Sequence, residues 1–282
     1  MWRIAKYVLA GIVALVVLVR FGLPSLLSGM GLHPHYAVPD FSLDGRRALI
    51  ISTSHGVLGD TGEPTGVFAS EMTAPYYAFL DAGMTVDVAS IQGGDIPIEP
   101  SSLEWPVVSA PDKRFLEDQM FLSKVARTYD IELVDMSDYD IVFLAGGWGA
   151  AYDFAQSEVL GAQMTAAYAG GAIIGGVCHG PLGLLQAQAA DGAPLVAGRR
   201  LTAVTDKQIS ELRITHTPKH PERDLRAAGA LFESDTAFRD FFANHVVIDG
   251  RIITGQNQNS GAETAAAMMQ ALINLSNGGN ES

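Results

Sequence analysis

Short apolar, strand-like runs, most of which carry no alternating polar residues, constrain the fold more than any other feature of the chain. They occur at residues 47–53, 85–90, 141–145 and 172–177. A strand that is buried on both faces shows this pattern, because helices cover both sides of a parallel sheet. The stretches between and after these runs predict helices at 65–82, 112–127, 161–169, 181–188 and 261–275.

Three further strands are expected in the second half of the chain. One lies at 201–204, and two more at 246–248 and 251–254 flank the pair Asp249-Gly250, which is typical of a hairpin turn. No internal repeat interrupts this order. The sequence therefore predicts an α/β fold with a single doubly wound, mostly parallel, flavodoxin-like sheet and helices on both faces, preceded by one N-terminal apolar helix.

The first 32 residues differ from the rest of the chain in charge. They contain Arg3, Lys6 and Arg20 and no acidic residue, whereas the whole chain has 18 Lys+Arg against 31 Asp+Glu. The continuous apolar run at 7–19 is shorter than the roughly 20 residues that cross a bilayer. Including residues 21–32, in which Pro24 is expected to kink or end the helix, makes a transmembrane span feasible.

Two interpretations of this segment stay open, an uncleaved membrane anchor and a cleaved signal peptide. The basic start and short apolar run fit a signal peptide, but no clear A-x-A-like cleavage site follows, which favours an anchor. Either way, the basic N-terminus is expected to stay cytoplasmic, with the body exported to the periplasmic or extracellular side, or secreted after cleavage. The domain prediction is an anchor or signal peptide at 1–32, a linker at 33–45 and one α/β domain at 46–282.

Composition excludes several function classes. The net charge of −13 argues against a general nucleic-acid binder, because phosphate contacts need a basic surface. The single cysteine, Cys178, excludes an intramolecular disulfide and zinc sites built from paired cysteines. The sequence Gly146-Gly-Trp-Gly149 lacks the spacing of a dinucleotide-binding loop, so we expect no nucleotide cofactor.

The cysteine lies where a buried strand turns into the next helix. Gly176-Val-Cys-His-Gly180 follows the run at 172–177, and Pro181 opens the predicted helix. This frame parallels a nucleophile elbow, which presents its central residue at the carboxyl end of the sheet. Backbone N–H groups at the start of the helix favour the thiolate and can bind an oxyanion. A buried, inert cysteine is the alternative, but the surrounding glycines and the turn favour a catalytic role.

Val177-Cys-His-Gly-Pro181 on this frame resembles the ThiJ/PfpI family of the class I glutamine amidotransferase-like superfamily. Three other segments match in the expected order: the helix of 65–79, the glycine loop of 144–154, and the C-terminal hairpin with its Thr-Gly-Gln-Asn ending at 254–257. The similarity covers nearly everything after the linker and is nearest to the chaperone and glyoxalase III-type branch. Members of this family are frequently homodimers.

The resemblance implies roles for five residues. Cys178 would be the nucleophile, Glu71 the catalytic carboxyl group, and His179 a base or a donor of an oxyanion-binding amide. Gly147 and Trp148 would form the oxyanion and substrate pocket. Apolar neighbours on the helix of Glu71 predict a partly buried carboxyl group with a raised pKa that could share a proton with Cys178. Trp148 stands where related sequences often have histidine, which predicts a more apolar pocket.

The acid that would complete a triad with His179 is left open by the sequence. Asp206 and Glu211 follow the predicted strand at 201–204, and each could instead be a surface charge. Farther on, residues 216–222 contain two histidines and a glutamate, but two prolines separate them. We therefore expect a loop near the site and no metal.

The function that the resemblance implies is a cofactor-free, cysteine-dependent conversion of small reactive carbonyl compounds. The substrate would be a 2-oxoaldehyde, and the product a 2-hydroxy acid, as in a glyoxalase III (D-lactate dehydratase) reaction through a hemithioacetal on Cys178. An amidase or peptidase with an acyl-enzyme is one alternative. A redox-sensing holdase chaperone that uses oxidation of Cys178 is the other.

Overall fold

A seven-stranded sheet forms the centre of the body, and the computed structural model describes residues 2–278 of the chain. Its strand order is β3-β2-β1-β4-β5-β9-β8, and every neighbouring pair is parallel except the antiparallel β8 and β9. The strands are β1 (Arg47–Ser52), β2 (Thr85–Ser90), β3 (Tyr129–Asp130), β4 (Ile141–Leu144), β5 (Ile173–Val177), β8 (Val246–Asp249) and β9 (Ile252–Gly255).

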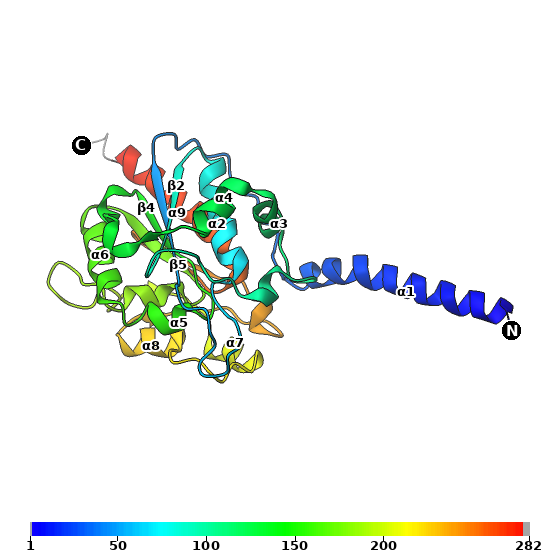
Figure 1. Ribbon diagram of the computed structural model, residues 1–282. Coiled ribbons are helices and arrows are strands. Elements are labelled where there is room, and N and C mark those ends of the chain that lie inside the picture. The colour runs from blue at the N-terminus through cyan, green and yellow to red at the C-terminus, as the bar shows by residue number, and fades with distance from the viewer. Residues whose placement is uncertain (1, 279–282) are drawn as a thin grey trace.

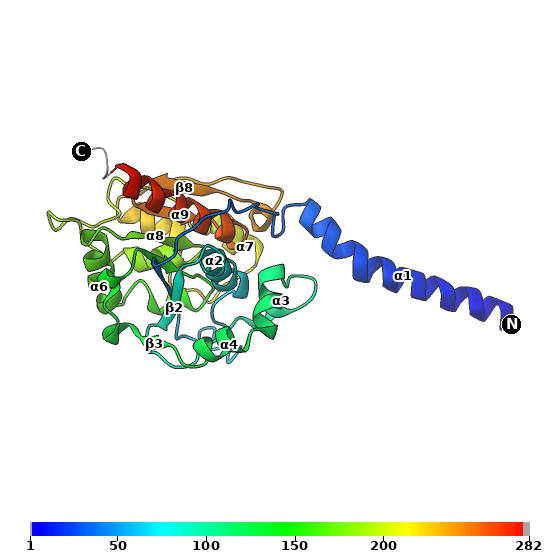
Figure 2. The same cartoon turned by 90° about the horizontal axis from the view of Figure 1, so that it is seen from above.

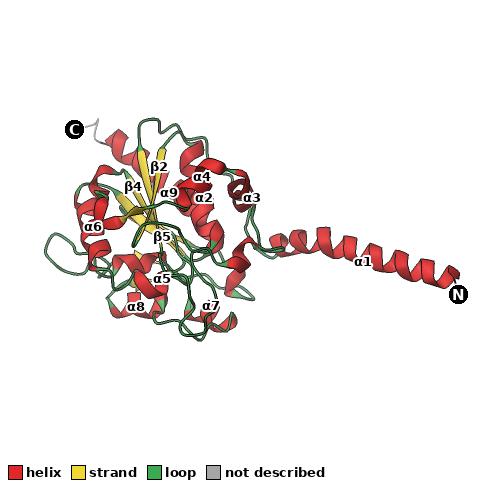
Figure 3. Ribbon diagram, in the orientation of Figure 1, coloured by secondary structure: helices red, strands yellow, loops and turns green. Residues whose placement is uncertain are grey.

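Helices cover both faces of this sheet (Figure 1, Figure 3). One face carries α2 (Ala69–Asp81), α3 (Ala110–Glu117), α4 (Gln119–Val125) and α9 (Gly261–Gly278). The other carries α5 (Ala150–Asp153), α6 (Glu158–Ala169) and α8 (Pro221–Ala227). Each face has its own apolar core, because β1, β4 and β5 are buried along nearly their whole length. The prediction of a doubly wound, mostly parallel α/β fold is confirmed.

Three of the predicted elements differ in the structure. The helix expected at 112–127 is two helices, because the Asp118 side chain accepts hydrogen bonds from the N–H groups of Met120 and Phe121 and starts α4. The strand expected at 201–204 shrinks to β6 (Arg200–Leu201), which pairs with β7 (Leu231–Phe232) in a separate two-stranded sheet. The helix expected at 181–188 is a 3₁₀ segment, Gly180–Leu184.

The N-terminal helix α1 (Trp2–Gly29) extends away from the body (Figure 2). Pro24 lies inside it, and the helix continues to Gly29. Its segment Ala5–Gly29 has a mean hydropathy of 2.2 and no buried residue, so it is long and apolar enough to cross a membrane. A signal sequence meets the same criteria.

The chain enters the body through a fixed contact at the end of α1. Leu32 is buried, and the N–H of His33 donates to Oδ1 of Asn259 at 2.9 Å. The His33 ring donates from Nε2 to the carbonyl of Val107 at 2.8 Å. The predicted linker has no helix or strand, but its first residues are held against the C-terminal part of the chain.

The strand order reverses between β1 and β4, since the chain first builds outward through β2 and β3 and then returns. In open α/β sheets the crevice at such a point, at the carboxyl ends of the strands, is where ligands bind. The segments that follow β1, β4 and β5 all reach this edge. They carry Glu71, the glycine loop and Cys178, respectively.

Candidate active site

Cys178 occupies a strained turn directly after β5. Its φ of 59° lies in the left-handed region, which non-glycine residues rarely adopt. The turn is fixed from two sides: the Cys178 N–H donates to the carbonyl of Gly255 at 3.1 Å, and its carbonyl accepts from the N–H of Val204 at 3.0 Å. Gly180 is required because a Cβ there would collide with the carbonyl oxygen of Leu144. The thiol is thereby held at the carboxyl end of the sheet.

Glu71, in the first turn of α2, places a fully buried carboxyl group against this thiol. Burial raises the pKa of Glu71 to about 8, although the Cys178 thiol and the N–H groups of Gly147 and Gly146 act in the opposite direction. A group with a pKa near neutrality can both accept and return a proton at physiological pH. The structure thus brings Glu71 and Cys178 together in one buried cavity, where the carboxyl group is placed to exchange a proton with the thiol.

Burial also raises the pKa of the Cys178 thiol, and the neighbouring Glu71 adds to this effect. The expectation from the turn alone, a lowered pKa, is therefore wrong for the resting site. The segment after Cys178 is a 3₁₀ stretch of only five residues, which supplies little helix dipole. The N–H groups of Gly147 and His179 do approach the sulfur and lower its pKa, but they do not outweigh burial.

His179 is buried beside the nucleophile. Its Nδ1 lies 3.4 Å from the Cys178 sulfur, while its Nε2 has no hydrogen-bond partner. Burial, with a smaller contribution from His220, lowers the pKa of His179 to about 3, so the ring is neutral at physiological pH. The ring of Trp148 packs edge-on against it, with centroids 4.7 Å apart.

Gly147 brings the loop after β4 into the site. Its φ of 97° is left-handed, and a Cβ there would collide with the backbone N–H of Phe68. The N–H of Gly147 is one of two that face the sulfur, and that of His179 is the other. Two convergent amides beside a nucleophile can bind the oxyanion that forms when a thiol adds to a carbonyl group.

Cys178, Glu71, His179, Gly147 and Trp148 line one small cavity, which we call the inner pocket. Its volume of about 30 Å³ holds one or two water molecules. Sequence reasoning missed the residues that complete its wall: Phe68, Val204, Gln208, Leu212, Phe241 and Gln258. Gln258 directly follows the Thr-Gly-Gln-Asn ending, and Phe68 lies in the matched segment 65–79, so these two had a local signal in the sequence.

Neither candidate for the third triad acid hydrogen-bonds to His179. Asp206, at the start of α7 (Asp206–Glu211), lies 2.8 Å from Nδ1 of His220. Glu211 accepts from the N–H of Asp240 at 2.8 Å. Within residues 2–278, the Nε2 atom of His179 meets no acid at all. The structure therefore assembles a pair of Cys178 and Glu71 with an adjacent histidine, and both acids serve other contacts.

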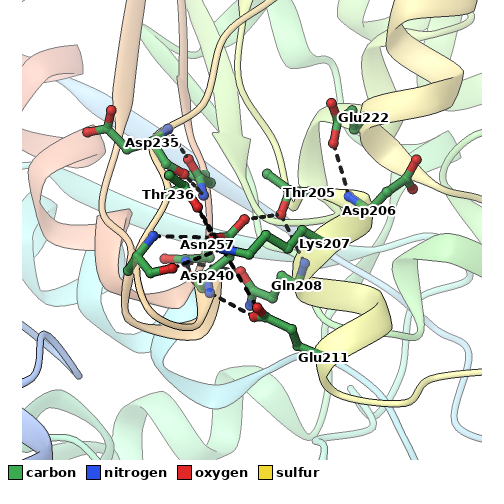
Figure 4. A network of polar contacts seen from close by, with 12 residues as sticks. Thr205, Asp206, Lys207, Gln208, Glu211, Glu222, Asp235, Thr236, Asp240 and Asn257 are labelled. Carbon is green, nitrogen blue, oxygen red and sulfur yellow. Dashed lines mark hydrogen bonds and ion pairs between the residues drawn. The ribbon is translucent and has the colours of Figure 1, made fainter.

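A cluster of hydrogen-bonded polar side chains reaches the inner pocket through Gln208 (Figure 4). We call Thr205, Lys207, Gln208, Asp240 and Asn257 the polar wall. The Asp240 carboxylate accepts from the hydroxyl of Thr205 at 2.8 Å and from Lys207 at 2.7 Å. Asn257 donates to the side-chain oxygen of Gln208 at 3.1 Å and to the carbonyl of Asp240 at 2.9 Å.

Comparison with known proteins identifies the family of the chain. The model of the DJ-1/PfpI family matches residues 64–273, which include all five predicted site residues. The chain belongs to the DJ-1/PfpI family. This confirms the resemblance inferred from the cysteine turn.

Relatives within the family carry glyoxalase names. The chain is 28% identical to the glutathione-independent glyoxalase HSP31 of Saccharomyces cerevisiae over 81% of its own length and 99% of the relative. It is 29% identical to Glyoxalase 3 of Candida albicans, over 74% and 91%.

Two solved structures of family relatives superpose well. Rapid Encystment Protein 24 kDa of Francisella tularensis has a TM-score of 0.75 at 30% identity, covering 80% of this chain and 99% of that one. Glyoxalase III of Candida albicans has a TM-score of 0.69 at 25% identity, covering 80% and 97%.

Proposed function

We propose that this protein is a cysteine-dependent, cofactor-free enzyme of the glyoxalase III type, which converts a 2-oxoaldehyde and water into a 2-hydroxy acid. The observation that carries the proposal is the buried pair of Cys178 and Glu71 beneath the amides of Gly147 and His179. The glyoxalase names of the relatives support it.

The reaction needs a nucleophile, an oxyanion site and a mobile proton. In the molecules in which Glu71 is ionised, the Cys178 sulfur adds to the aldehyde carbon and its proton passes to Glu71, while the amides of Gly147 and His179 bind the oxyanion. Return of the proton to that oxygen gives a hemithioacetal. Removal of the hydrogen from this carbon and protonation of the neighbouring carbonyl carbon turn it into a 2-hydroxy thioester. Water then cleaves the thioester, which releases the hydroxy acid and restores the thiol.

Glu71 is better suited than His179 to move the proton between the two carbons. Its pKa of about 8 lies close to physiological pH, so both protonation states are accessible, whereas the pKa of His179 is lowered to about 3. We assign His179 to orientation: its Nδ1 lies against the sulfur, and its unpartnered Nε2 is available to a polar group of the substrate.

We further propose that α1 anchors the protein in a membrane, with the body on the exported side. Its apolar segment is entirely unburied, and Lys6 near the N-terminus fits a cytoplasmic start. Alkaline carbonate extraction of cell membranes tests this. Retention of the full-length chain in the pellet is expected, and release of a chain shortened by the leader would instead indicate a cleaved signal peptide.

A turnover assay with methylglyoxal tests the chemistry. The full chain is expected to form lactate without added thiol or metal. Cys178→Ser should lower kcat/KM at least about a thousandfold, because the hydroxyl is a far weaker nucleophile without a strong base. Glu71→Gln should lower it by about 10²–10⁴-fold through loss of proton transfer.

Glu132→Gln, which alters an exposed carboxylate that does not line the inner pocket, is the matched control and should retain wild-type turnover. Turnover by Cys178→Ser within tenfold of the wild type would contradict the proposal. A burst of product from activated amides, without turnover of methylglyoxal, would point to a hydrolase instead.

A further inference from the structure

A second hollow lies directly outside the inner pocket, and the proposed reaction does not account for it. Its volume is about 420 Å³, and it shares Phe68, Trp148, Leu212 and Phe241 with the inner pocket. We call this hollow the vestibule. Because four large apolar side chains belong to both cavities, they form the boundary between them, and a molecule reaching Cys178 from the vestibule must pass this boundary.

The residues that line the vestibule favour the binding of neutral, apolar groups. Val107 and Ile214 add to its apolar surface. Its two charged residues, Glu63 and Glu99, are both acidic, and Glu99 already accepts hydrogen bonds from the hydroxyls of Thr65 and Ser101. Carboxylates at this position disfavour an anionic substrate. No basic residue lines the hollow to bind a phosphate or a carboxylate.

The vestibule also lies next to the point where α1 joins the body. The carbonyl of Val107, a lining residue, accepts the hydrogen bond from His33. Two residues earlier, the ring of Trp105 lies 5.4 Å from the guanidinium carbon of Arg20 on α1. Arginine and tryptophan side chains are typical of the zone between lipid headgroups and water. With α1 in a bilayer, the vestibule would lie close to the membrane surface, where apolar aldehydes accumulate.

The inner pocket alone is too small for an extended substrate. At about 30 Å³ it accommodates little more than the reacting carbonyl carbons, so the rest of the molecule must extend across Phe68 and Trp148 into the vestibule. Methylglyoxal, whose remaining group is a methyl, would leave the vestibule empty. A longer alkyl chain would fill it and remove apolar surface from water.

We propose that the vestibule is a subsite for the alkyl tail of the substrate, and that this protein acts on apolar-tailed 2-oxoaldehydes that partition into membranes. The inference rests on the proposed glyoxalase function and specifies its substrate class. The chemistry at Cys178 is unchanged, because the tail takes no part in bond making or breaking.

The test is a chain-length series measured with the full-length protein in phosphatidylcholine vesicles. Methylglyoxal, 2-oxohexanal, 2-oxooctanal and 2-oxodecanal are compared by kcat/KM. Each methylene that the vestibule buries should raise kcat/KM by up to about fourfold, which corresponds to ~0.8 kcal/mol per CH₂. The increase should stop once the hollow is filled.

Variants separate the vestibule from general partitioning of the substrate into lipid. Ile214→Asp should lower the ratio of kcat/KM for 2-oxooctanal to that for methylglyoxal by at least about tenfold, because the tail would meet a charge. Val107→Asp, on a different segment, provides a second variant if the first does not fold. Leu133→Asp is the matched control, since Leu133 is 85% exposed and lies outside the vestibule, and it should retain the wild-type ratio.

Equal kcat/KM across the series in a protein that turns over methylglyoxal would overturn the tail subsite and leave the proposed function intact. A chain-length increase that survives in both Ile214→Asp and Val107→Asp would overturn it as well. Failure of the wild type on every member, methylglyoxal included, would contradict the proposed function and the inference with it.

Discussion

Two groups of polar side chains border the inner pocket, and they differ in how completely their hydrogen bonds are formed. In the polar wall, none of the five side chains has a buried polar atom without a partner. Among the residues next to Cys178, Oε2 of Glu71 and Nε2 of His179 are buried without one. An unpaired buried polar atom costs about 1–3 kcal/mol, so a fold keeps it only where another role compensates. We therefore expect the polar wall to contribute to stability, and Glu71 and His179 to contribute to the reaction.

The contrast predicts that the wall contributes to stability far more than Glu71 does. The largest effect should come from Asp240→Ala, which removes the acceptor for Thr205, Lys207 and Thr236 at once. We expect the free energy of unfolding to fall by about 1–3 kcal/mol, because the buried hydroxyl of Thr205 loses its acceptor. Urea unfolding of the full chain in detergent micelles, followed by circular dichroism, measures it.

Asp240→Asn keeps the shape of the side chain and should cost less than Asp240→Ala. The effect is also pH-dependent. Burial works to raise the pKa of Asp240, but hydrogen bonds from Lys207, Thr205 and Thr236 outweigh it and hold this pKa below its usual value. The stabilisation is therefore present at neutral pH and is lost as the pH falls through the lowered pKa. A loss below about 1 kcal/mol for Asp240→Ala would contradict the role of the wall.

Glu71 should show the opposite behaviour. Its pKa of about 8 in the folded protein exceeds the ordinary value of 4.5, so the folded state binds more protons between these pH values. The contribution of Glu71 to the free energy of unfolding should therefore fall as the pH rises from about 5 to 8, by on the order of a few kcal/mol, whereas the contribution of His179, whose pKa is lowered to about 3, rises with pH up to about 6.5.

Glu71→Gln cannot ionise and should remove most of this slope, which makes the variant more stable than the wild type at pH 8 while it is nearly inactive. Urea titrations of the variant and the wild type at pH 5, 6.5 and 8 test this, and ionisation of the unfolded cysteine largely cancels in the comparison because both chains carry Cys178. Glu132→Gln, with an exposed carboxylate, should keep the wild-type slope. An unchanged slope in Glu71→Gln would show that Glu71 is charged in the resting site.

Gln208 belongs to both regions, since it lines the inner pocket and also bonds Asn257 and Gln258. If it acts as part of the wall, Gln208→Met should lower the free energy of unfolding by about 1–2 kcal/mol. Turnover of methylglyoxal should then change by less than about fivefold. A large fall in kcat without a loss of stability would show that Gln208 takes part in the reaction. The polar wall would then not be purely structural.

The features that could be predicted from the sequence are those that depend on residues next to one another in the chain. Unbroken apolar runs indicate the buried strands. Glycines on both sides of a strand-to-helix turn indicate the role of Cys178. The wall and the vestibule depend on contacts between distant parts of the chain, as when His33 bonds Asn259 or Phe241 meets Trp148 around one cavity. The lowered pKa expected for Cys178 was wrong for the same reason, because burial by Glu71 and α2 is a property of the assembled fold.

The smallest effects are expected for the two acids that the sequence offered as triad members. Asp206 pairs with His220, and Glu211 supports the backbone of Asp240, so neither orients His179 directly. Asp206→Asn and Glu211→Gln should each lower kcat/KM for methylglyoxal by less than about tenfold, whereas an acid that holds a catalytic histidine is worth about 10⁴-fold.

The two variants should nonetheless differ from each other. Glu211→Gln weakens the hydrogen bond that the carboxylate accepts from the N–H of Asp240, a residue of the polar wall. This should reduce the free energy of unfolding by about 1 kcal/mol. Asp206 is half exposed, so Asp206→Asn should leave stability nearly unchanged. A thousandfold loss of kcat in either variant would show that the resting site rearranges to form a triad during turnover.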